Sequence, residues 1–115
     1  MPSHDSTVYL LHMLEHARET VAFMQRKTRE DLENDRLLNL AIIRLLEITG
    51  EAASKVELEE RQRYPAIPWG QIIGLRNRLI HGYDLINLDI VWNIITTDLP
   101  PLISELETIL GQNAP

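Results

Sequence analysis

Apolar residues recur at helical spacing along most of the chain. In residues 6–26 they follow one another at intervals of three and four, which is the spacing of a helical stripe that faces a core. The members of this stripe are Leu10, Met13, Leu14, Ala17, Val21 and Met24. A second stripe consists of Leu37, Leu38, Ala41, Ile42, Leu45, Ile48, Ala52 and Val56. The two patterns predict two long helices that share one core.

Polar residues at the ends of these stripes predict where helices begin. Thr28 and Asp31 resemble a capping box with Asp in place of the usual Glu or Gln, which predicts a short helical turn. Asn34 or Asp35 then opens the second long helix. Near the end of that helix, the small residues at 50–54 are expected to let another backbone come close.

The second half of the chain predicts two more helices. Pro68 suits the first turn of a helix, where its missing N–H costs nothing. Asn87 can cap the last helical region, which must bend or split at Pro100 and Pro101. The apolar stripe of that region consists of Val91, Trp92, Ile95, Leu99, Leu102, Ile103, Leu106, Ile109 and Leu110. The expected fold is all-α, an up-down four-helix bundle with a short extra helix, formed by a single domain over residues 1–115.

Composition narrows the functional classes. The chain lacks cysteine, so it can form neither a disulfide framework nor a thiolate metal site, which suits a reducing cytoplasm. It shows no basic leader and no apolar run long enough for a membrane span, so no membrane association is expected. The formal charge of −6 argues against broad, sequence-blind coating of nucleic acids.

One segment departs from this acidic average. Residues 61–83 hold four of the 11 basic side chains and none of the 17 acidic ones. The basic residues are Arg61, Arg63, Arg76 and Arg78. The stretch GLRNRLIHGYD at 74–84 therefore lies in the one basic part of the chain.

The helix that begins near Pro68 is expected to continue through this stretch. An ideal helix would place Trp69, Ile72, Ile73, Arg76, Ile80 and Tyr83 on one face. A second line would consist of Gly70, Gly74, Asn77 and His81, with little bulk at its start and hydrogen-bonding groups at its end. Arg76 and His81 would then lie about 140° apart, since successive residues turn by about 100°. They could converge only through a deformed helix, a wrapped arginine or a symmetric partner.

The same residues also have a structural interpretation. Arg76 would extend from the edge of the core, and His81 would lie near a helix C-terminus, where a cation is favoured. Gly82 would be the glycine that ends the helix. The spacing of one arginine and one histidine does not decide between this interpretation and a functional site.

The wider context resembles a known family. The pattern Arg76-Asn77-x-x-x-His81-x-Tyr83, on the penultimate helix of a small acidic helical chain, resembles the HEPN superfamily and, within it, the HepT toxins of HEPN–MNT toxin–antitoxin pairs. Their signature is Arg-x4-His-x-Tyr. The stretches LEITGEAASKV, YPAIPWGQIIGLRNRLIHGY and DIVWNIITTDLPPLISELE also look like later helices of that family.

The resemblance implies a metal-independent endoribonuclease that needs no cofactor and cleaves RNA by attack of the 2′-hydroxyl. His81 is the candidate general acid or base, because imidazole titrates near neutral pH. Arg76 offers a planar, always-charged group for phosphate oxygens. Asn77 could orient the imidazole or bind ribose, Arg78 is a further candidate contact to RNA, and Tyr83 could hold a phosphate or stack on a base.

The resemblance also implies partners. One histidine per chain is little for two proton transfers, and in the family a homodimer brings two motifs into one cleft. Tyr83 matches the site where a cognate MntA-type minimal nucleotidyltransferase antitoxin attaches AMP from ATP. The alternative is a non-catalytic HEPN-like dimer that binds a nucleotide or a nucleotidyltransferase.

A rival motif lies in the first helix. His12-Met13-Leu14-Glu15-His16 spells the H-x-x-E-H pattern of some zinc proteases. A protease also needs a third ligand and a substrate cleft, and no other such cluster is present in the sequence. We therefore expect these side chains to form the solvated side of the helix, and we expect no metal site.

Overall fold

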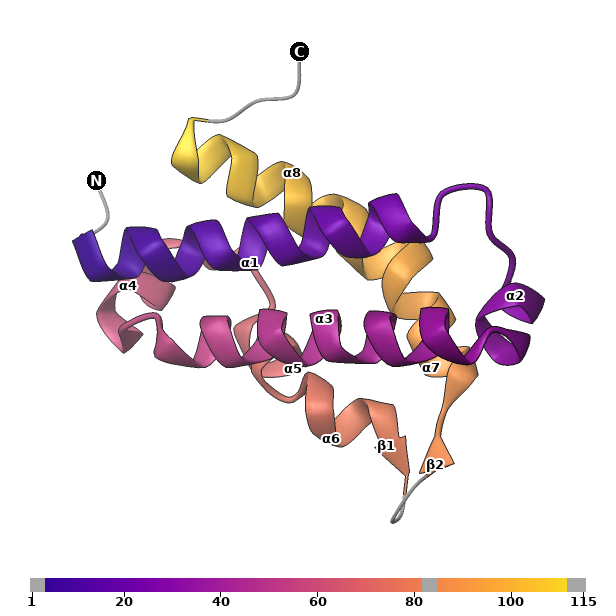
Figure 1. Ribbon diagram of the computed structural model, residues 1–115. Coiled ribbons are helices and arrows are strands. Elements are labelled where there is room, and N and C mark those ends of the chain that lie inside the picture. Colours follow the sequence, from indigo (N-terminus) through magenta and orange to yellow (C-terminus); the bar gives the residue numbers. More distant parts are fainter. Residues whose placement is uncertain (1–3, 82–84, 112–115) are drawn as a thin grey trace.

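The computed structural model describes residues 4–81 and 85–111, and it confirms an all-α bundle (Figure 1). The first long helix, α1 (His4–Phe23), lies antiparallel to the second, α3 (Arg36–Lys55). The short α2 (Arg29–Asn34) connects them. Thr28 and Asp31 form the expected capping box, and Asp35 caps α3 by accepting from the Leu38 N–H at 3.1 Å.

The second half of the chain supplies the other two layers. A short helix α4 (Leu58–Arg63), which the sequence did not predict, follows α3. Helices α5 (Trp69–Ile73) and α6 (Leu75–Leu79) then run back along α3. They lead to two short strands, β1 (Ile80–His81) and β2 (Leu85–Ile86), which pair antiparallel.

The last helical region is bent but not split. It consists of α7 (Leu88–Asn93), a π-helical stretch η1 (Ile94–Asp98) and α8 (Leu99–Leu110), which packs on α1. Pro100 and Pro101 have no N–H to donate, and the Leu99 N–H reaches back five residues to the Ile94 carbonyl. The π turn therefore absorbs the bend just before the prolines. Asn87 caps α7 as expected, its side chain accepting from the Ile90 N–H at 3.1 Å.

The core lies between these layers, and the helical stripes predict most of it. Its largest fully buried side chains are Leu10, Met13, Leu14, Leu32, Ile42, Leu46, Leu79, Ile94, Leu99, Leu106, Val56 and Val91. Leu37 is an exception, since it was expected in the stripe of α3 but is 82% exposed. It lies in the first turn of α3, and no layer of the described structure covers that side of the turn.

Candidate functional site

The candidate site is built on α5 and α6. Pro68 immediately precedes α5, and the Trp69 indole fixes the start of the helix. Its Nε1–H points at the carbonyl oxygens of Arg61 and Tyr64, at 3.0 and 3.1 Å. The half-buried ring thus ties α5 to the end of α4.

A close backbone contact sets the position of α5 against α3. A Cβ atom added to Gly50 of α3 would lie 2.7 Å from the carbonyl oxygen of Ile72, which is too close for any side chain. The sequence prediction that small residues here admit another backbone is confirmed at Gly50. Ile72, Leu75 and Leu79 are buried on the α3 side of the segment.

The expected continuous helix through residue 83 is wrong. It breaks at Gly74, which ends α5, and α6 ends at Leu79. The face of this segment that enters the core carries Ile72, Leu75 and Leu79, at intervals of three and four residues. Arg76 therefore does not interrupt an apolar face, and the ideal-helix angle of about 140° between Arg76 and His81 no longer applies.

His81 lies on a strand rather than on a helix. In the two-residue ladder His81 pairs with Leu85 and Ile80 pairs with Ile86. The Asn87 N–H then donates to the Leu79 carbonyl at 3.1 Å, which closes the connection between α6 and α7. The His81 side chain and all of Gly82 and Tyr83 lie outside the part of the chain that the structure describes.

Arg76 and Asn77 are exposed on α6. The Arg76 side chain is 74% exposed, and its Nε lies 3.7 Å from Oε2 of Glu47 on α3. Arg76 and Glu47 line a shallow pocket of about 150 Å³, together with Gly50, Glu51, Ser54 and Ile73. A contact this long and this exposed is weak, so the guanidinium can exchange Glu47 for a phosphate oxygen.

Glu47 was not among the sequence candidates. It lies on α3 one turn before Gly50, the residue that admits α5. The sequence could have indicated Glu47, because a side chain one turn from the close contact at Gly50 must lie beside the exposed residues of α5 and α6.

Arg78 points to the opposite side of α6 from Arg76. Its Nη2 lies 3.6 Å from Oδ2 of Asp98 in η1, and both side chains are about one third exposed. Within this chain the structure thus does not bring Arg76 and Arg78 to the same face.

The other two arginines of the basic segment have local partners. Arg61 donates from Nε to the Val56 carbonyl and from Nη2 to the Ser54 carbonyl, at 2.8 and 2.9 Å, so it caps the end of α3. Arg63 lies 3.7 Å from Glu60. Of the four arginines, Arg76 has the most exposed side chain, and it directly precedes Asn77.

The histidines of the rival motif make a local contact on α1. His16 Nδ1 lies 2.6 Å from the His12 carbonyl oxygen, and the two rings meet edge to face with centroids 6.3 Å apart. Over residues 4–81 and 85–111, no group of three or more His, Asp or Glu side chains is arranged to hold a metal ion. None of the described helices is both long enough and apolar enough to span a bilayer.

Comparisons with known proteins agree on the kind of protein. The family model "Ribonuclease HepT-like" matches residues 13–109. A protein of Methanocaldococcus jannaschii named "Putative RNase MJ1380" is 33% identical over 95% of this chain and all of its own length. A second protein of that organism, "Putative RNase MJ0127", is 34% identical over 96% of this chain and 91% of its own length. "Probable ribonuclease HepT" of Thermococcus cleftensis is 31% identical, with 84% and 91% covered.

The fold and the matched region define a HEPN-type helical protein. The chain belongs to the HepT-like ribonuclease family. No solved structure matches it.

Proposed function

We propose that this protein is a metal-independent endoribonuclease toxin, neutralised when a minimal nucleotidyltransferase antitoxin attaches AMP to Tyr83. The observation that carries the proposal is the complete set Arg76, Asn77, His81 and Tyr83 in a chain of the HepT-like family. Relatives named as ribonucleases support the RNase part of the proposal.

The cleavage needs only groups that RNA and the protein supply. The ribose 2′-oxygen attacks the adjacent phosphorus and gives up its proton to a general base, and the bond from phosphorus to the 5′-oxygen breaks. The leaving 5′-oxygen takes a proton, so the products are a 2′,3′-cyclic phosphate and a 5′-hydroxyl. His81 is assigned to these proton transfers, and Arg76 to the charge that builds on the phosphate oxygens.

The surroundings of Arg76 support its role. Its weak contact to Glu47 holds the guanidinium at the surface without neutralising it through a short, buried pair. Asn77 is exposed next to it, and only Arg78 and α6's last residue, Leu79, separate this pair from the β1 strand that carries His81. Arg78 is assigned a more distant RNA contact, because it points toward η1.

The proposed active form is a homodimer, since one histidine per chain is little for two proton transfers and a second copy supplies another. The outer side of α3 supports a specific face for it. Leu37 and Leu40 are 82% and 49% exposed there, and Arg44 and Glu47 follow them at helical spacing toward the Arg76 pocket. Burying two exposed leucines against a second copy would place two Arg76 residues near one interface.

The dimer face can be tested with the double variant Leu37→Glu and Leu40→Glu. We expect a monomer in analytical ultracentrifugation, unchanged helical circular dichroism and loss of RNA cleavage. Leu58→Glu is the matched control, because Leu58 is 64% exposed on α4, away from this face. A double variant that stays dimeric would exclude this face.

Cleavage of a fluorescent RNA by the purified protein tests the catalytic assignment. His81→Ala and Arg76→Ala should each lower the rate by roughly 10²–10⁴-fold, and EDTA should have no effect. His12→Ala and Arg63→Ala are matched controls on exposed histidine and arginine positions, and they should keep full activity. Full activity of His81→Ala, or dependence on added metal, would overturn the mechanism.

The proposed AMP transfer is a nucleophilic substitution at phosphorus. The Tyr83 phenol oxygen attacks the α-phosphorus of ATP, its proton passes to a base of the nucleotidyltransferase, and pyrophosphate leaves. The adduct brings negative charge and bulk beside Arg76 and His81, so it competes with RNA phosphate.

Intact-protein mass spectrometry tests this step after incubation with ATP and the cognate enzyme. The mass of one or more AMP units should appear on the wild type and on Tyr64→Phe, but not on Tyr83→Phe. A modified wild type with undiminished RNase activity would contradict the regulatory role. A folded dimer that binds nucleotide or the nucleotidyltransferase, but never cleaves RNA, would instead support the non-catalytic alternative.

A further inference from the structure

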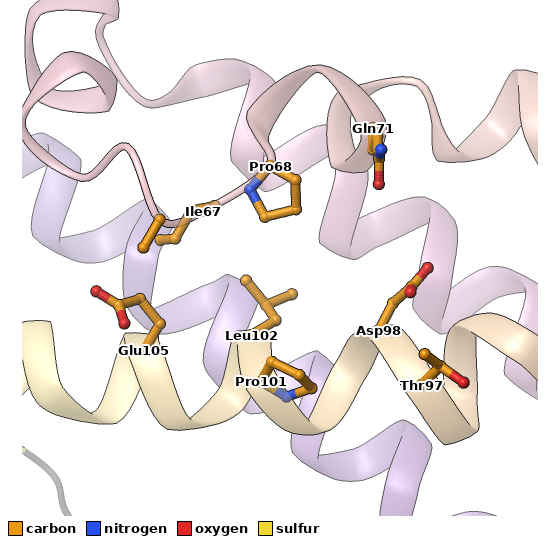
Figure 2. Close-up of a pocket in the computed structure, with 9 residues that line it drawn as sticks. Ile67, Pro68, Gln71, Thr97, Asp98, Pro101, Leu102 and Glu105 are labelled. Carbon is orange, nitrogen blue, oxygen red and sulfur yellow. The ribbon is translucent and has the colours of Figure 1, made fainter.

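A groove on the other side of α6 is separate from the Arg76 pocket. It has a volume of about 340 Å³ and lies between the segment 66–71 and the helix formed by η1 and α8 (Figure 2). That volume is in the range of small-molecule sites. None of Arg76, Asn77 and Glu47 lines it, so it is distinct from the pocket beside Arg76.

The middle of the groove is apolar. Leu102 projects toward Pro68 from across the groove, with Pro101 beside it, and Ile67 borders the same space (Figure 2). Leu102 and Ile67 are 4% and 2% exposed, so their positions are fixed by the core. Such a floor accepts the methylene groups of a linear ligand and gains free energy by covering them.

Both ends of the apolar floor carry a carboxylate from the same helix. Asp98 and Glu105 are seven residues apart and lie on either side of Leu102 (Figure 2). Two helical turns separate their backbones by roughly 10 Å. The Gln71 amide points from α5 toward Asp98, and its oxygen can accept a further hydrogen bond.

Neither carboxylate is engaged in a short ion pair within the part of the protein that the structure describes. The Glu105 side chain makes no ion pair or hydrogen bond with any of the residues that the structure describes. Asp98 has the 3.6 Å contact to Arg78, which is longer than a hydrogen bond and partly exposed to water. That contact occupies one oxygen of Asp98 and leaves the other for a ligand.

We propose that this groove binds a linear aliphatic polyamine, with one ammonium group at Glu105, a second beside Asp98 and Gln71, and the methylene chain on Leu102, Pro101 and Pro68. The alternation of carboxylate, apolar floor and carboxylate matches the alternation of charge and methylene in such a molecule. RNA does not fit, because its phosphates would face two carboxylates.

The proposal is tested by titrating the full-length ¹⁵N-labelled protein with spermidine and recording amide shifts. We expect saturable shifts confined to residues 66–71 and 97–105. Glu105→Gln should weaken binding about tenfold, the effect of losing one charge-assisted hydrogen bond. Glu19→Gln is the matched control, since it removes the same charge from the exposed side of α1 and should leave the affinity unchanged.

Two further measurements distinguish binding in the groove from a general attraction of cations to an acidic protein. Thr97→Lys places an ammonium group of the protein's own next to Asp98, on an exposed position of η1, and should abolish the shifts. 1,4-Butanediol, which has methylenes but no charge, should not bind. Shifts spread over all acidic surfaces, equal affinity of Glu105→Gln, or binding of a lysine peptide but not of spermidine would each overturn the proposal.

Discussion

The helix pair α1–α3 and the segment from Trp69 to His81 are held in place in different ways. Long stripes of apolar residues bury α1 and α3 against each other over many turns. In contrast, α5 and α6 are five residues each, too short to be stable alone. Single contacts position them: the Gly50 contact to the Ile72 carbonyl, the Trp69 indole bonds and the Asn87–Leu79 bond.

This difference explains how Arg76 and Asn77 can be exposed on a short helix that is held in place. The buried residues of α6 are Leu75 and Leu79, so its remaining positions are available for polar side chains. Arg76 uses the side toward α3, Arg78 uses the side toward η1, and Asn77 is exposed to solvent. The long helices provide stability, and the short segment carries polar side chains on two faces.

The largest effect is expected in the core beneath α3. Leu46 is fully buried, and Leu46→Ala should lower the free energy of unfolding by about 2–5 kcal/mol through lost burial and a cavity. Leu58→Ala makes the same change at a 64% exposed position and should cost less than about 0.5 kcal/mol. Urea unfolding of both variants measures the difference, and equal losses would contradict the assignment of the core.

The contact at Gly50 is the next largest test. Gly50→Ala should lower the free energy of unfolding by about 1–3 kcal/mol, because the added methyl must displace the Ile72 backbone. Gly70→Ala, in α5, adds its methyl to open space and should raise stability by about 0.5–1 kcal/mol through helix propensity. Thermal unfolding decides, and a stabilised Gly50→Ala would show that this contact does not position α5.

The same contrast explains what the sequence could predict. The two long helices, the capping box at Thr28 and the caps Asp35 and Asn87 depend on residues close in sequence, so periodicity and cap chemistry found them. The presence of Gly50 even predicted a close backbone approach. It did not say which backbone would approach.

The site segment could not be predicted with the same accuracy. The break at Gly74 depends on how α5 meets α3, and this contact joins residues far apart in sequence. The sequence prediction placed Arg76 on the apolar face because it took Trp69 and Ile73 as the buried residues beside Ile72, whereas the core takes Leu75 and Leu79. The groove between Pro68 and Asp98 was also missed, because its two walls come from separate helices.

The capping box of α2 should have a smaller effect, with a pH dependence. Thr28→Ala should lower the free energy of unfolding by about 1 kcal/mol at pH 7. Hydrogen bonds from the Thr28 backbone N–H and hydroxyl hold the pKa of Asp31 below its usual value of 3.8. A lowered pKa in the folded state means that this contribution is present at neutral pH and is lost as pH falls through that pKa.

Urea unfolding of the wild type and Thr28→Ala at pH 7 and pH 3 measures this dependence. The difference between the two proteins should be smaller at pH 3, because that pH lies below the usual pKa of 3.8 and part of the contribution of Asp31 is then lost. Asp35 caps α3 without a capping box, so Asp35→Asn serves as a control that keeps the side-chain oxygen. A difference that does not change with pH would show that the Asp31 carboxylate does not contribute to the stability of the cap.

The smallest effect is expected where α2 meets the start of α7. Arg29 Nη2 lies 2.7 Å from Oδ1 of Asp89, but the Asp89 side chain is 82% exposed, so water and salt screen the pair. A double-mutant cycle with Arg29→Ala and Asp89→Ala should give a coupling of about 0.2–1 kcal/mol in dilute buffer, decreasing in 1 M NaCl. Asp89 also lies in the first turn of α7, where a negative charge is favoured, so Asp89→Ala alone should cost more than the coupling. A coupling above about 2 kcal/mol would mean that this surface pair, like Gly50, fixes the second half of the bundle against the first.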